Sequence, residues 1–238
     1  MQAVLLAGGR GTRLRPYTTV FPKPLVPVGE QPICEIVVRQ LAAAGFDRIV
    51  FTVSHLAGLI EAYFGDGARW GVQISYAREE TPLGTVGPIA MLDHLDENFL
   101  IMNGDVLTDL DYRHLMDQHL ASGAIATLTN CRKEVPISLG VVEISPDHRL
   151  LDYIEKPVLD YQASMGIYAL NRRVVQFVPR GQRMDLPDLM RLLIQKQEPV
   201  QCYEFKGEWH DIGRPEDYEE AQNRFAEAPQ LFVPAPKR

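Results

Sequence analysis

The chain has 238 residues, of which 46% are hydrophobic, and its 24 Lys and Arg against 31 Asp and Glu give a formal net charge of −7. A chain of this length buries a core without a disulfide or metal staple, and no apolar run approaches the roughly 18 residues that a membrane span needs. The acidic balance argues against a general nucleic-acid binder, which would carry a basic face. We therefore expect a globular protein with no nucleic-acid or membrane partner.

Cysteine usage and the first residues indicate the compartment. Cys34, Cys131 and Cys202 are odd in number, widely spaced and form no CxxC pair, which is typical of reduced thiols. No charged segment followed by a long apolar run opens the chain, so we expect no signal peptide. Both observations predict a cytoplasmic protein.

Strands and helices alternate through the first half of the chain. Continuous apolar runs predict buried strands, and helical periodicity separates them. The expected strands are residues 2–7, 48–53, 72–77, 98–105 and 124–130, and the expected helices are 33–44, 56–64, 86–95 and 111–123. This rhythm predicts an α/β fold with a mixed, mostly parallel central sheet and helices on both faces.

The rhythm changes after Cys131. Short strand patterns dominate, with two clear helices among them. The expected strands are 139–144, 149–155, 165–170 and 199–205, and the expected helices are 185–197 and 215–228. No linker separates the halves, so we expect a mixed extension of the same sheet in one domain over 1–228, followed by a loosely held Pro-rich tail at 229–238.

The first 29 residues are purely cationic. They carry Arg10, Arg13, Arg15 and Lys23 and no Asp or Glu. The loop "GGRGTRLRP" follows a buried strand, and ligands of open α/β sheets bind beyond the carboxyl ends of strands. Glycines let the backbone approach a ligand, successive N–H groups can cradle an anion, and arginine matches phosphate oxygens. The pattern predicts a polyphosphate pocket; the alternative is a solvated surface loop.

Two general nucleotide motifs are absent. The sequence has no GxxxxGK[ST], which argues against a P-loop NTPase. Gly9-x-Gly11 opens a GxGxxG pattern, but Leu14 stands in place of the third glycine, so a dinucleotide-binding dehydrogenase is not expected.

The wider pattern is more specific. "LAGGRGTRLRPYTTVFPKPLVPVGEQP", then "ETPLGTVG", "NGD", "EKP", "MGIY" and "WHDIG", resembles the signature of the sugar-1-phosphate nucleotidyltransferases, or NDP-sugar pyrophosphorylases, in a short form without a left-handed β-helix domain. The resemblance implies a GT-A-like (Rossmann-like) fold with a nucleotide-binding half at about 1–130 and a sugar-binding half at about 131–228. It also implies the reaction of an NTP with a sugar 1-phosphate, giving NDP-sugar and pyrophosphate with Mg²⁺.

The resemblance assigns roles on the nucleotide side. It implies that Arg13 binds the departing phosphates and that Lys23 bridges phosphates at the reacting centre. Whether Arg10 and Arg15 contact phosphate or only solvent stays open. The implied nucleotide-binding residues are Leu6, Ala7, Gly8, Gly9, Gly11, Thr12, Glu80, Pro82, Gly84, Thr85 and Asp105.

Metal and sugar residues follow from the same resemblance. Mg²⁺ takes oxygen ligands and is usually held by one or two carboxylates plus substrate phosphates, and the implied ligands are Asp105 and Asp211. Lys156 matches the lysine that holds the sugar phosphate, and Glu155 matches the carboxylate that binds sugar hydroxyls. The implied sugar-phosphate residues are Asn103, Gly140, Glu155, Lys156 and Gly166.

Alternatives remain open for the base, the sugar and the class of protein. "PLGTVG" stands where some relatives carry "DGLAQA", a pattern associated with thymidylyl transfer, and so favours guanylyl transfer to a mannose- or heptose-type 1-phosphate. Uridylyl, thymidylyl or cytidylyl transfer to another phosphorylated sugar or polyol remains open. A glycosyltransferase using Asp109 and Asp111, or a non-catalytic nucleotide-sugar sensor, is the alternative from another class, although the pair of aspartates also suits a helix N-cap. A homodimer is a further possibility.

Overall fold

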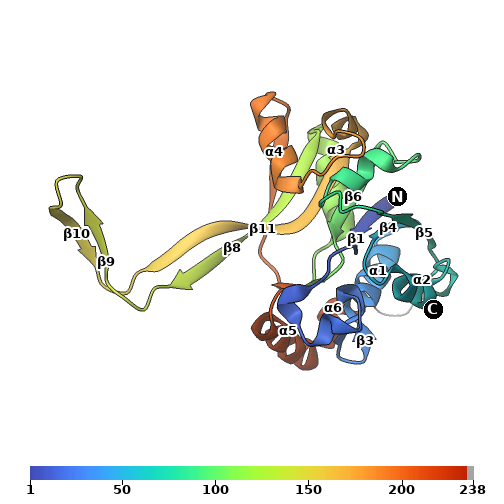
Figure 1. Cartoon of the computed structure of the whole chain (residues 1–238), viewed down its shortest axis with the longest axis horizontal. Coiled ribbons are helices and arrows are strands. Elements are labelled where there is room, and N and C mark those ends of the chain that lie inside the picture. The colour runs from blue at the N-terminus through green and yellow to red at the C-terminus, as the bar shows by residue number, and fades with distance from the viewer. Residues whose placement is uncertain (235–238) are drawn as a thin grey trace.

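A computed structural model describes residues 1–234 of the chain. A seven-stranded sheet in the order β12-β8-β11-β6-β1-β4-β5 forms its centre (Figure 1). The strands of this sheet are β1 (Gln2–Leu6), β4 (Arg48–Val53), β5 (Gln73–Arg78), β6 (Asn98–Asn103), β8 (Ala126–Pro136), β11 (Val158–Asn171) and β12 (Val200–Phe205). Two short two-stranded sheets flank it: β2 (Pro27–Val28) with β3 (Gln31–Pro32), and β7 (Val106–Thr108) with β13 (Trp209–Asp211).

The two halves of the chain share one sheet. β1 pairs in parallel with β4 and β6, and β4 pairs in parallel with β5. β11 joins antiparallel to β6 and β8, and β12 runs parallel to β8. These pairings confirm the α/β fold with a mixed, mostly parallel sheet, and they make the second half an extension of the first.

Helices cover both faces of the sheet because successive strand residues point to opposite sides. Ala3 and Leu5 of β1 pack with α1, α2 and α3, whereas Val4 packs in a second cluster with α4. The helices are α1 (Ile33–Ala43), α2 (Ala57–Phe64), α3 (Tyr112–Ser122), α4 (Leu186–Gln195), α5 (Pro215–Glu227) and α6 (Pro229–Phe232). Short 3₁₀ turns lie at Thr12–Leu14, Tyr17–Thr19, Lys23–Leu25, Ala68–Trp70, Gly87–Met91 and Arg172–Phe177.

The expected helix at residues 86–95 is wrong in type and length. A 3₁₀ turn at Gly87–Met91 takes its place, with Pro88 in its first turn. The N–H groups of Val86 and Gly87 both donate to the carbonyl of Met184 at 3.1 Å. This loop is therefore anchored to the segment before α4, and the turn ends at Leu92, whose backbone is extended (φ −82°, ψ 124°).

The segment after residue 228 is packed, not loose, as far as residue 234. α6 buries Phe232, whose ring stacks on Phe225 with centroids 6.1 Å apart. Gln40 Nε2 donates to the Phe232 carbonyl at 2.8 Å. Val233 packs against the same hydrophobic cluster as Phe232, so apolar contacts and a hydrogen bond both hold this short segment. The rest of the expected tail, 235–238, lies outside the described residues.

A long two-stranded arm leaves the central sheet. β8 and β11 continue past the end of β12, whose last pair is Phe205 with Cys131, and they lead into the antiparallel hairpin β9 (Val141–Ile144) and β10 (Leu150–Ile154). Figure 1 shows this ribbon projecting far from the body of the molecule. We call residues 132–162 the arm. The sequence predicts its strands but as shorter members of the sheet.

In the part of the chain that the structure describes, no helix is both long and apolar enough to span a bilayer.

Candidate functional site

A cavity of about 460 Å³ lies where β1, β4 and β6 end. Ligand pockets in proteins commonly measure about 300–1,000 Å³, and the carboxyl edge of a parallel sheet is where open α/β folds bind ligands. The lining residues are Leu6, Ala7, Gly8, Gly9, Gly11, Thr12, Arg13, Lys23, Pro24, Thr52, Ser54, Glu79, Pro82, Gly84, Thr85, Asn103, Asp105 and Gly213. Most of the nucleotide-side residues expected from the sequence therefore share one cavity.

The loop after β1 is held by its neighbours and keeps free donors. The N–H of Ala7 donates to Thr52 O at 2.9 Å, and Thr18 Oγ1 donates to Gly11 O at 2.7 Å. Within residues 1–234, the N–H groups of Gly8, Gly9 and Arg10 donate to no protein acceptor. Successive unpaired N–H groups are what an anion-binding nest offers.

Gly11 is required at its position by geometry. Its φ is +59°, and a Cβ built there would lie 2.9 Å from Thr18 Cγ2 and 3.1 Å from Lys23 Cβ. A left-handed backbone with this little space suits only glycine. The loop can therefore turn back toward Lys23 because the third residue of "GRG" has no side chain.

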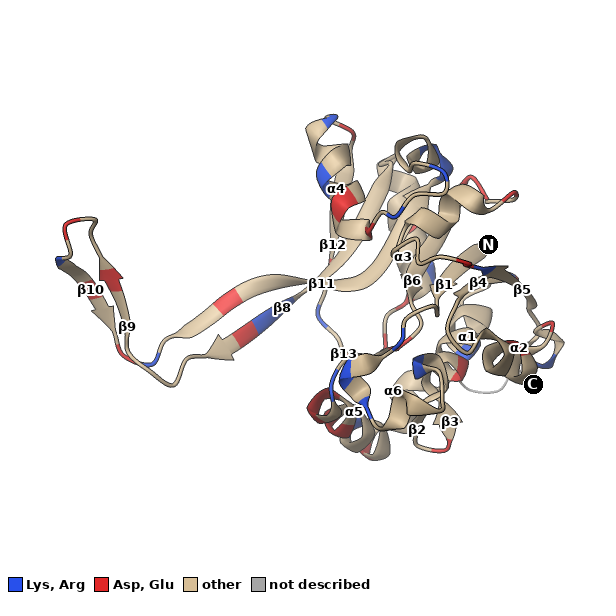
Figure 2. Ribbon diagram, in the orientation of Figure 1, with Lys and Arg blue, Asp and Glu red and all other residues tan. Residues whose placement is uncertain are grey.

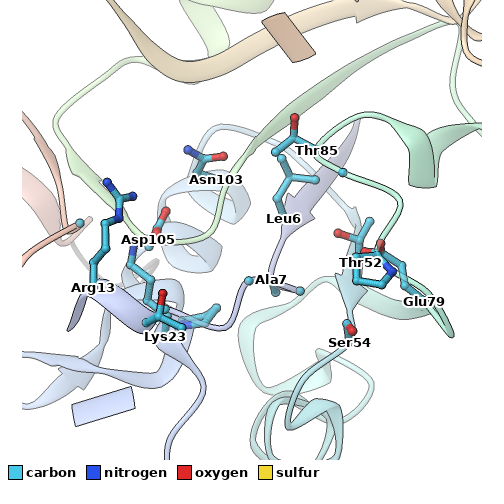
Figure 3. A pocket seen from close by; sticks show the side chains of 18 residues that line it. Leu6, Ala7, Arg13, Lys23, Thr52, Ser54, Glu79, Thr85, Asn103 and Asp105 are labelled. Carbon is cyan, nitrogen blue, oxygen red and sulfur yellow. Dashed lines mark ion pairs between the residues drawn. The ribbon is translucent and has the colours of Figure 1, made fainter. Parts of the chain in front are cut away.

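Arg13 and Lys23 bring positive charge to one side of the cavity. Lys23 Nζ forms an ion pair with the carboxylate of Asp105, and their side chains are only 12% and 16% exposed. Figure 3 shows Arg13, Lys23 and Asp105 gathered on one side of Ala7. Arg10 and Arg15 are exposed and do not line the cavity.

The two expected metal ligands are brought together although they lie far apart in the sequence. β13 pairs with β7 so that Asp211 stands opposite Val106, and the N–H of Ile212 donates to the Asp105 carbonyl at 3.2 Å. Burial raises the pKa of Asp211, the Asp105 charge raises it further, and Lys23 and Arg13 lower it. Two neighbouring carboxylates offer oxygen ligands, which are the ligands that a hard divalent cation takes.

The opposite side of the cavity contains residues that the sequence analysis missed. Thr52, Ser54 and Glu79 lie there, across Ala7 from Arg13 (Figure 3). The signal was present, because Thr52 lies at the end of β4, Ser54 follows β4 and Glu79 follows β5. Ligands bind at those carboxyl ends.

Glu79, not Glu80, is the glutamate at the cavity. Its Oε2 accepts the Leu83 N–H at 2.8 Å, and a Cβ built on Gly8 would lie 3.1 Å from its Oε1. Burial raises the pKa of Glu79, and the Leu83 hydrogen bond lowers it. Glu80 is exposed and outside the lining.

The loop "PLGTVG" is fastened to the start of α4. The Thr85 N–H donates to Asp185 Oδ1 at 2.9 Å, and Thr85 Oγ1 accepts the Leu186 N–H at 2.7 Å. Gly84 has a φ of +80°, and a Cβ there would lie 2.5 Å from the Met184 carbonyl oxygen. These contacts fix the wall formed by Pro82, Gly84 and Thr85.

The expected sugar-phosphate residues fall into two separate groups. Asn103 lines the cavity, and a Cβ built on Gly166 would lie 2.6 Å from its Nδ2. Gly140, Glu155 and Lys156 lie instead on the arm. The structure therefore places Asn103 at the cavity with Gly166 packed against it, and leaves the other three residues on the projecting ribbon.

A glycine-rich, cationic cavity at the carboxyl edge of a mostly parallel sheet is typical of α/β proteins that bind phosphorylated ligands. Residues 2–228 match the profile of the family described as Nucleotidyl transferase, and the chain belongs to that family. Its members generally use a divalent metal ion.

Two curated relatives each match more than nine tenths of this chain. UTP–glucose-1-phosphate uridylyltransferase of Synechocystis sp. is 36% identical over 241 residues, covering 93% of this chain and 62% of the relative. Mannose-1-phosphate guanylyltransferase of Mycobacterium tuberculosis is 35% identical over 225 residues, covering 92% of this chain and 62% of the relative. The chain thus spans about three fifths of the length of these relatives.

A solved structure supports the fold. The crystal structure of a Bacillus anthracis protein assigned as a glucose-1-phosphate thymidylyltransferase superposes with a TM-score of 0.79, covering 100% of this chain and 98% of that chain at 22% identity. The fold of the chain is therefore the GT-A-like fold expected from the resemblance.

Proposed function

We propose that the protein transfers a nucleotidyl group from an NTP to a sugar 1-phosphate, releasing pyrophosphate and forming an NDP-sugar. One observation carries the proposal: Arg13, Lys23, Asp105 and the free N–H groups of the Gly8–Gly11 loop converge on one cavity. These groups suit a triphosphate, and the family and the named activities of the relatives support the same reaction.

The reaction joins two anions, so it needs positioning and charge neutralisation. A sugar-phosphate oxygen attacks the α-phosphorus, its new P–O bond forms, and the bond to pyrophosphate breaks. Lys23 and Arg13 bind the phosphate oxygens, and the loop N–H groups donate to them as negative charge grows on the leaving group. Mg²⁺, held by Asp105 and Asp211, would add charge neutralisation at the same place.

The base has its own side of the cavity. Thr52, Ser54, Glu79 and Thr85 offer hydrogen-bond donors and acceptors there, across Ala7 from the cations. We propose guanine as the base and a mannose-type 1-phosphate as the acceptor, which the Mycobacterium tuberculosis relative's named activity supports. Uridylyl transfer is the second candidate, since the Synechocystis relative is named for it.

A glycosyltransferase using Asp109 and Asp111 has less support. Asp109 Oδ1 accepts the Glu208 N–H at 2.7 Å, and Asp111 caps α3 by accepting the His114 N–H at 2.9 Å. Neither residue lines the cavity described above. A sensor without catalysis is disfavoured because Arg13, Lys23 and both carboxylates are all in place.

A cytoplasmic location belongs to the same proposal. Cys34, Cys131 and Cys202 are all free thiols, which suits a reducing compartment.

The test is pyrophosphate release with Mg²⁺, using each of five NTPs against a panel of hexose, heptose and amino-sugar 1-phosphates. We expect release with one strongly preferred pair, and GTP with mannose 1-phosphate as that pair. Arg13→Ala should lower kcat/KM by about 100-fold or more, because it removes phosphate contacts that strengthen in the transition state. Arg15→Ala, a cation of the same loop outside the cavity, is the matched control and should keep near wild-type activity.

No release from the wild type with any pair, while the folded protein still binds an NTP, would overturn the proposed reaction. Preferred release with UTP and glucose 1-phosphate would keep the reaction and replace the base and the sugar.

A further inference from the structure

The arm brings Gly140, Tyr153 and Glu155 into contact. The Tyr153 hydroxyl donates to Glu155 Oε2 at 2.9 Å, and a Cβ built on Gly140 would collide with the Tyr153 hydroxyl. Lys156 follows at once, with a left-handed φ of +46°. The arm thus holds a hydroxyl and a carboxylate in contact, with a lysine next in the sequence, and all three residues are exposed.

Lys156 cannot reach the cavity of its own chain while the arm keeps its pairing. β8 and β11 form an unbroken ladder from Ser164 with Asn130 to Val158 with Pro136. The six residues from Ser164 to Val158 therefore span about 20 Å, at roughly 3.3 Å per residue, and Lys156 lies two residues beyond the end of β11. Bringing Lys156 back to Asn103 in the same chain would break this ladder.

The arm also carries an apolar surface that residues 1–234 leave exposed. Of the 20 large hydrophobic residues exposed in residues 1–234, 12 lie on the arm: Val135, Leu139, Val141, Val142, Ile144, Leu150, Leu151, Tyr153, Ile154, Val158, Leu159 and Tyr161. An isolated two-stranded ribbon is at best marginally stable in water. An exposed apolar ribbon with two open edges is a template for another chain.

The area is large enough for a specific interface. Twelve half-exposed apolar side chains offer on the order of 1,000 Å², and an interface of standard size takes about 800 Å² from each partner. Residues 1–29, which we call the head, offer a second exposed apolar group, Tyr17, Val20 and Phe21, directly before Lys23 of the cavity.

We propose that two copies of this chain exchange arms, so that each arm places Gly140, Glu155 and Lys156 at the sugar side of the other copy's cavity. The occupant is a second copy because one chain carries both the incomplete cavity and the group that it lacks. Exchange of an identical element between copies under twofold symmetry satisfies both cavities at once. The inference rests on the proposed function, since it assigns the arm to the sugar phosphate of that reaction.

Activity of mixed dimers tests the exchange. Lys23→Ala copies with an intact arm are co-expressed with Lys156→Ala copies with an intact head, and the mixed dimer is isolated through two different tags. Each variant alone should lose about 100-fold or more in kcat/KM. In the mixed dimer one of the two sites combines the intact head and the intact arm, so activity should return to about half of the wild-type value.

The reverse mixture gives the matched control. A chain carrying both Lys23→Ala and Lys156→Ala is paired with a wild-type chain. Exchange predicts an inactive dimer, because each site then holds one altered half. About half of the wild-type activity in this dimer, or none in the first, would overturn the exchange. Lys196→Ala, an exposed lysine on the body, replaces Lys156→Ala to show that loss of any lysine is not enough.

A second measurement does not depend on activity. In a Cys202→Ser background, Lys156→Cys copies are mixed with Asn103→Cys copies, treated with a short bis-maleimide and separated on a denaturing gel. We expect a band of two linked chains, and none when Lys196→Cys replaces Lys156→Cys. A monomer by analytical ultracentrifugation, or no linked band, would overturn the exchange. An inactive wild type that still gives the band would overturn the proposed reaction and leave the arm exchange standing.

Discussion

At the scale of single residues, Asp105 and Lys23 define the reacting side of the cavity. Their side chains form an ion pair in a place where both are largely shielded from water. Breaking such a pair by neutralising one partner leaves the other charge without compensation. The same carboxylate is the residue that, together with Asp211, fits a divalent cation, so one substitution should affect both roles.

We therefore expect Asp105→Asn to lower kcat by about 100-fold or more and to raise the Mg²⁺ concentration needed for half-maximal rate. Steady-state pyrophosphate release over a range of Mg²⁺ concentrations measures both effects. Asp117→Asn, an exposed aspartate on α3 paired with Arg113, is the matched control. Near-wild-type rate at the usual Mg²⁺ concentration in Asp105→Asn would contradict the role of this carboxylate.

At the scale of elements, α3 contains a buried histidine whose hydrogen-bond partners within residues 1–234 are uncharged. His119 is 1% exposed, with Nδ1 2.8 Å from Thr127 Oγ1 and Nε2 3.2 Å from Asn98 Oδ1. Burial lowers the pKa of His119 below its usual value of 6.5. The folded protein therefore keeps this ring neutral in a pH range where the unfolded chain binds a proton.

Because the unfolded state binds more protons, the free energy of unfolding should fall as the pH drops from about 7 toward 5, with a slope from this one group of at most about 1.4 kcal/mol per pH unit. Urea denaturation at several pH values measures the slope. His119→Gln should flatten it, whereas His114→Gln, an exposed histidine of the same helix, should leave it unchanged. An equally steep slope in His119→Gln would rule out this histidine as the cause.

A comparison of the predicted and observed elements shows which features a single sequence can predict. The cationic head was predictable because a glycine-rich loop directly after a buried strand has few structural roles other than binding. The sequence predicts Glu80 at the pocket, but its neighbour Glu79 lies there. Glu79 is the residue that follows β5 and accepts the Leu83 N–H. The pairing of β5 with β4 determines which residue after β5 reaches the cavity, and this pairing cannot be read from a single sequence.

The strands of the arm were predicted at 139–144 and 149–155, but their projection from the body was not. These strands carry the same Val, Leu, Ile and Tyr residues as a strand packed on its own sheet, so the sequence predicts an extension of the central sheet. Apolar composition indicates that a strand will be covered, but it does not indicate which chain covers it. The projecting ribbon follows from how far β8 and β11 stay paired.

At the scale of the whole molecule, a third hydrophobic cluster joins the two ends of the described chain. Leu14, Val26 and Val28 of the head pack in it with Phe225 and Phe232 from α5 and α6. This cluster supports the loop that carries Lys23, although its last members lie more than two hundred residues later. The stability of the cavity therefore depends on the segment that the sequence analysis takes as a tail.

Phe232→Ala should lower the free energy of unfolding by about 3–5 kcal/mol, the usual loss for removing a buried aromatic side chain. Chemical denaturation monitored by circular dichroism measures it. Leu231→Ala, 41% exposed and adjacent, should cost about 0.5 kcal/mol or less. A loss of less than about 1 kcal/mol for Phe232→Ala would mean that this end contributes little to the fold.

The contact between the head and α5 can form only after α5 has been synthesised. The Gly29 N–H donates to Gln222 Oε1 at 2.8 Å, and Tyr218 Oη donates to the Pro27 carbonyl at 2.8 Å. Figure 1 shows the first loops of the chain beside α5 and α6. These partners lie 191 and 193 residues apart, so a ribosome adding about 5–20 residues per second produces α5 roughly 10–40 seconds after the head.

During that interval the apolar face of the nascent head, including Leu14 and Val28, lacks its final cover. This face is therefore open to chaperones while translation proceeds. A slow codon cluster before α5 would lengthen this exposure without changing a single residue of the finished protein.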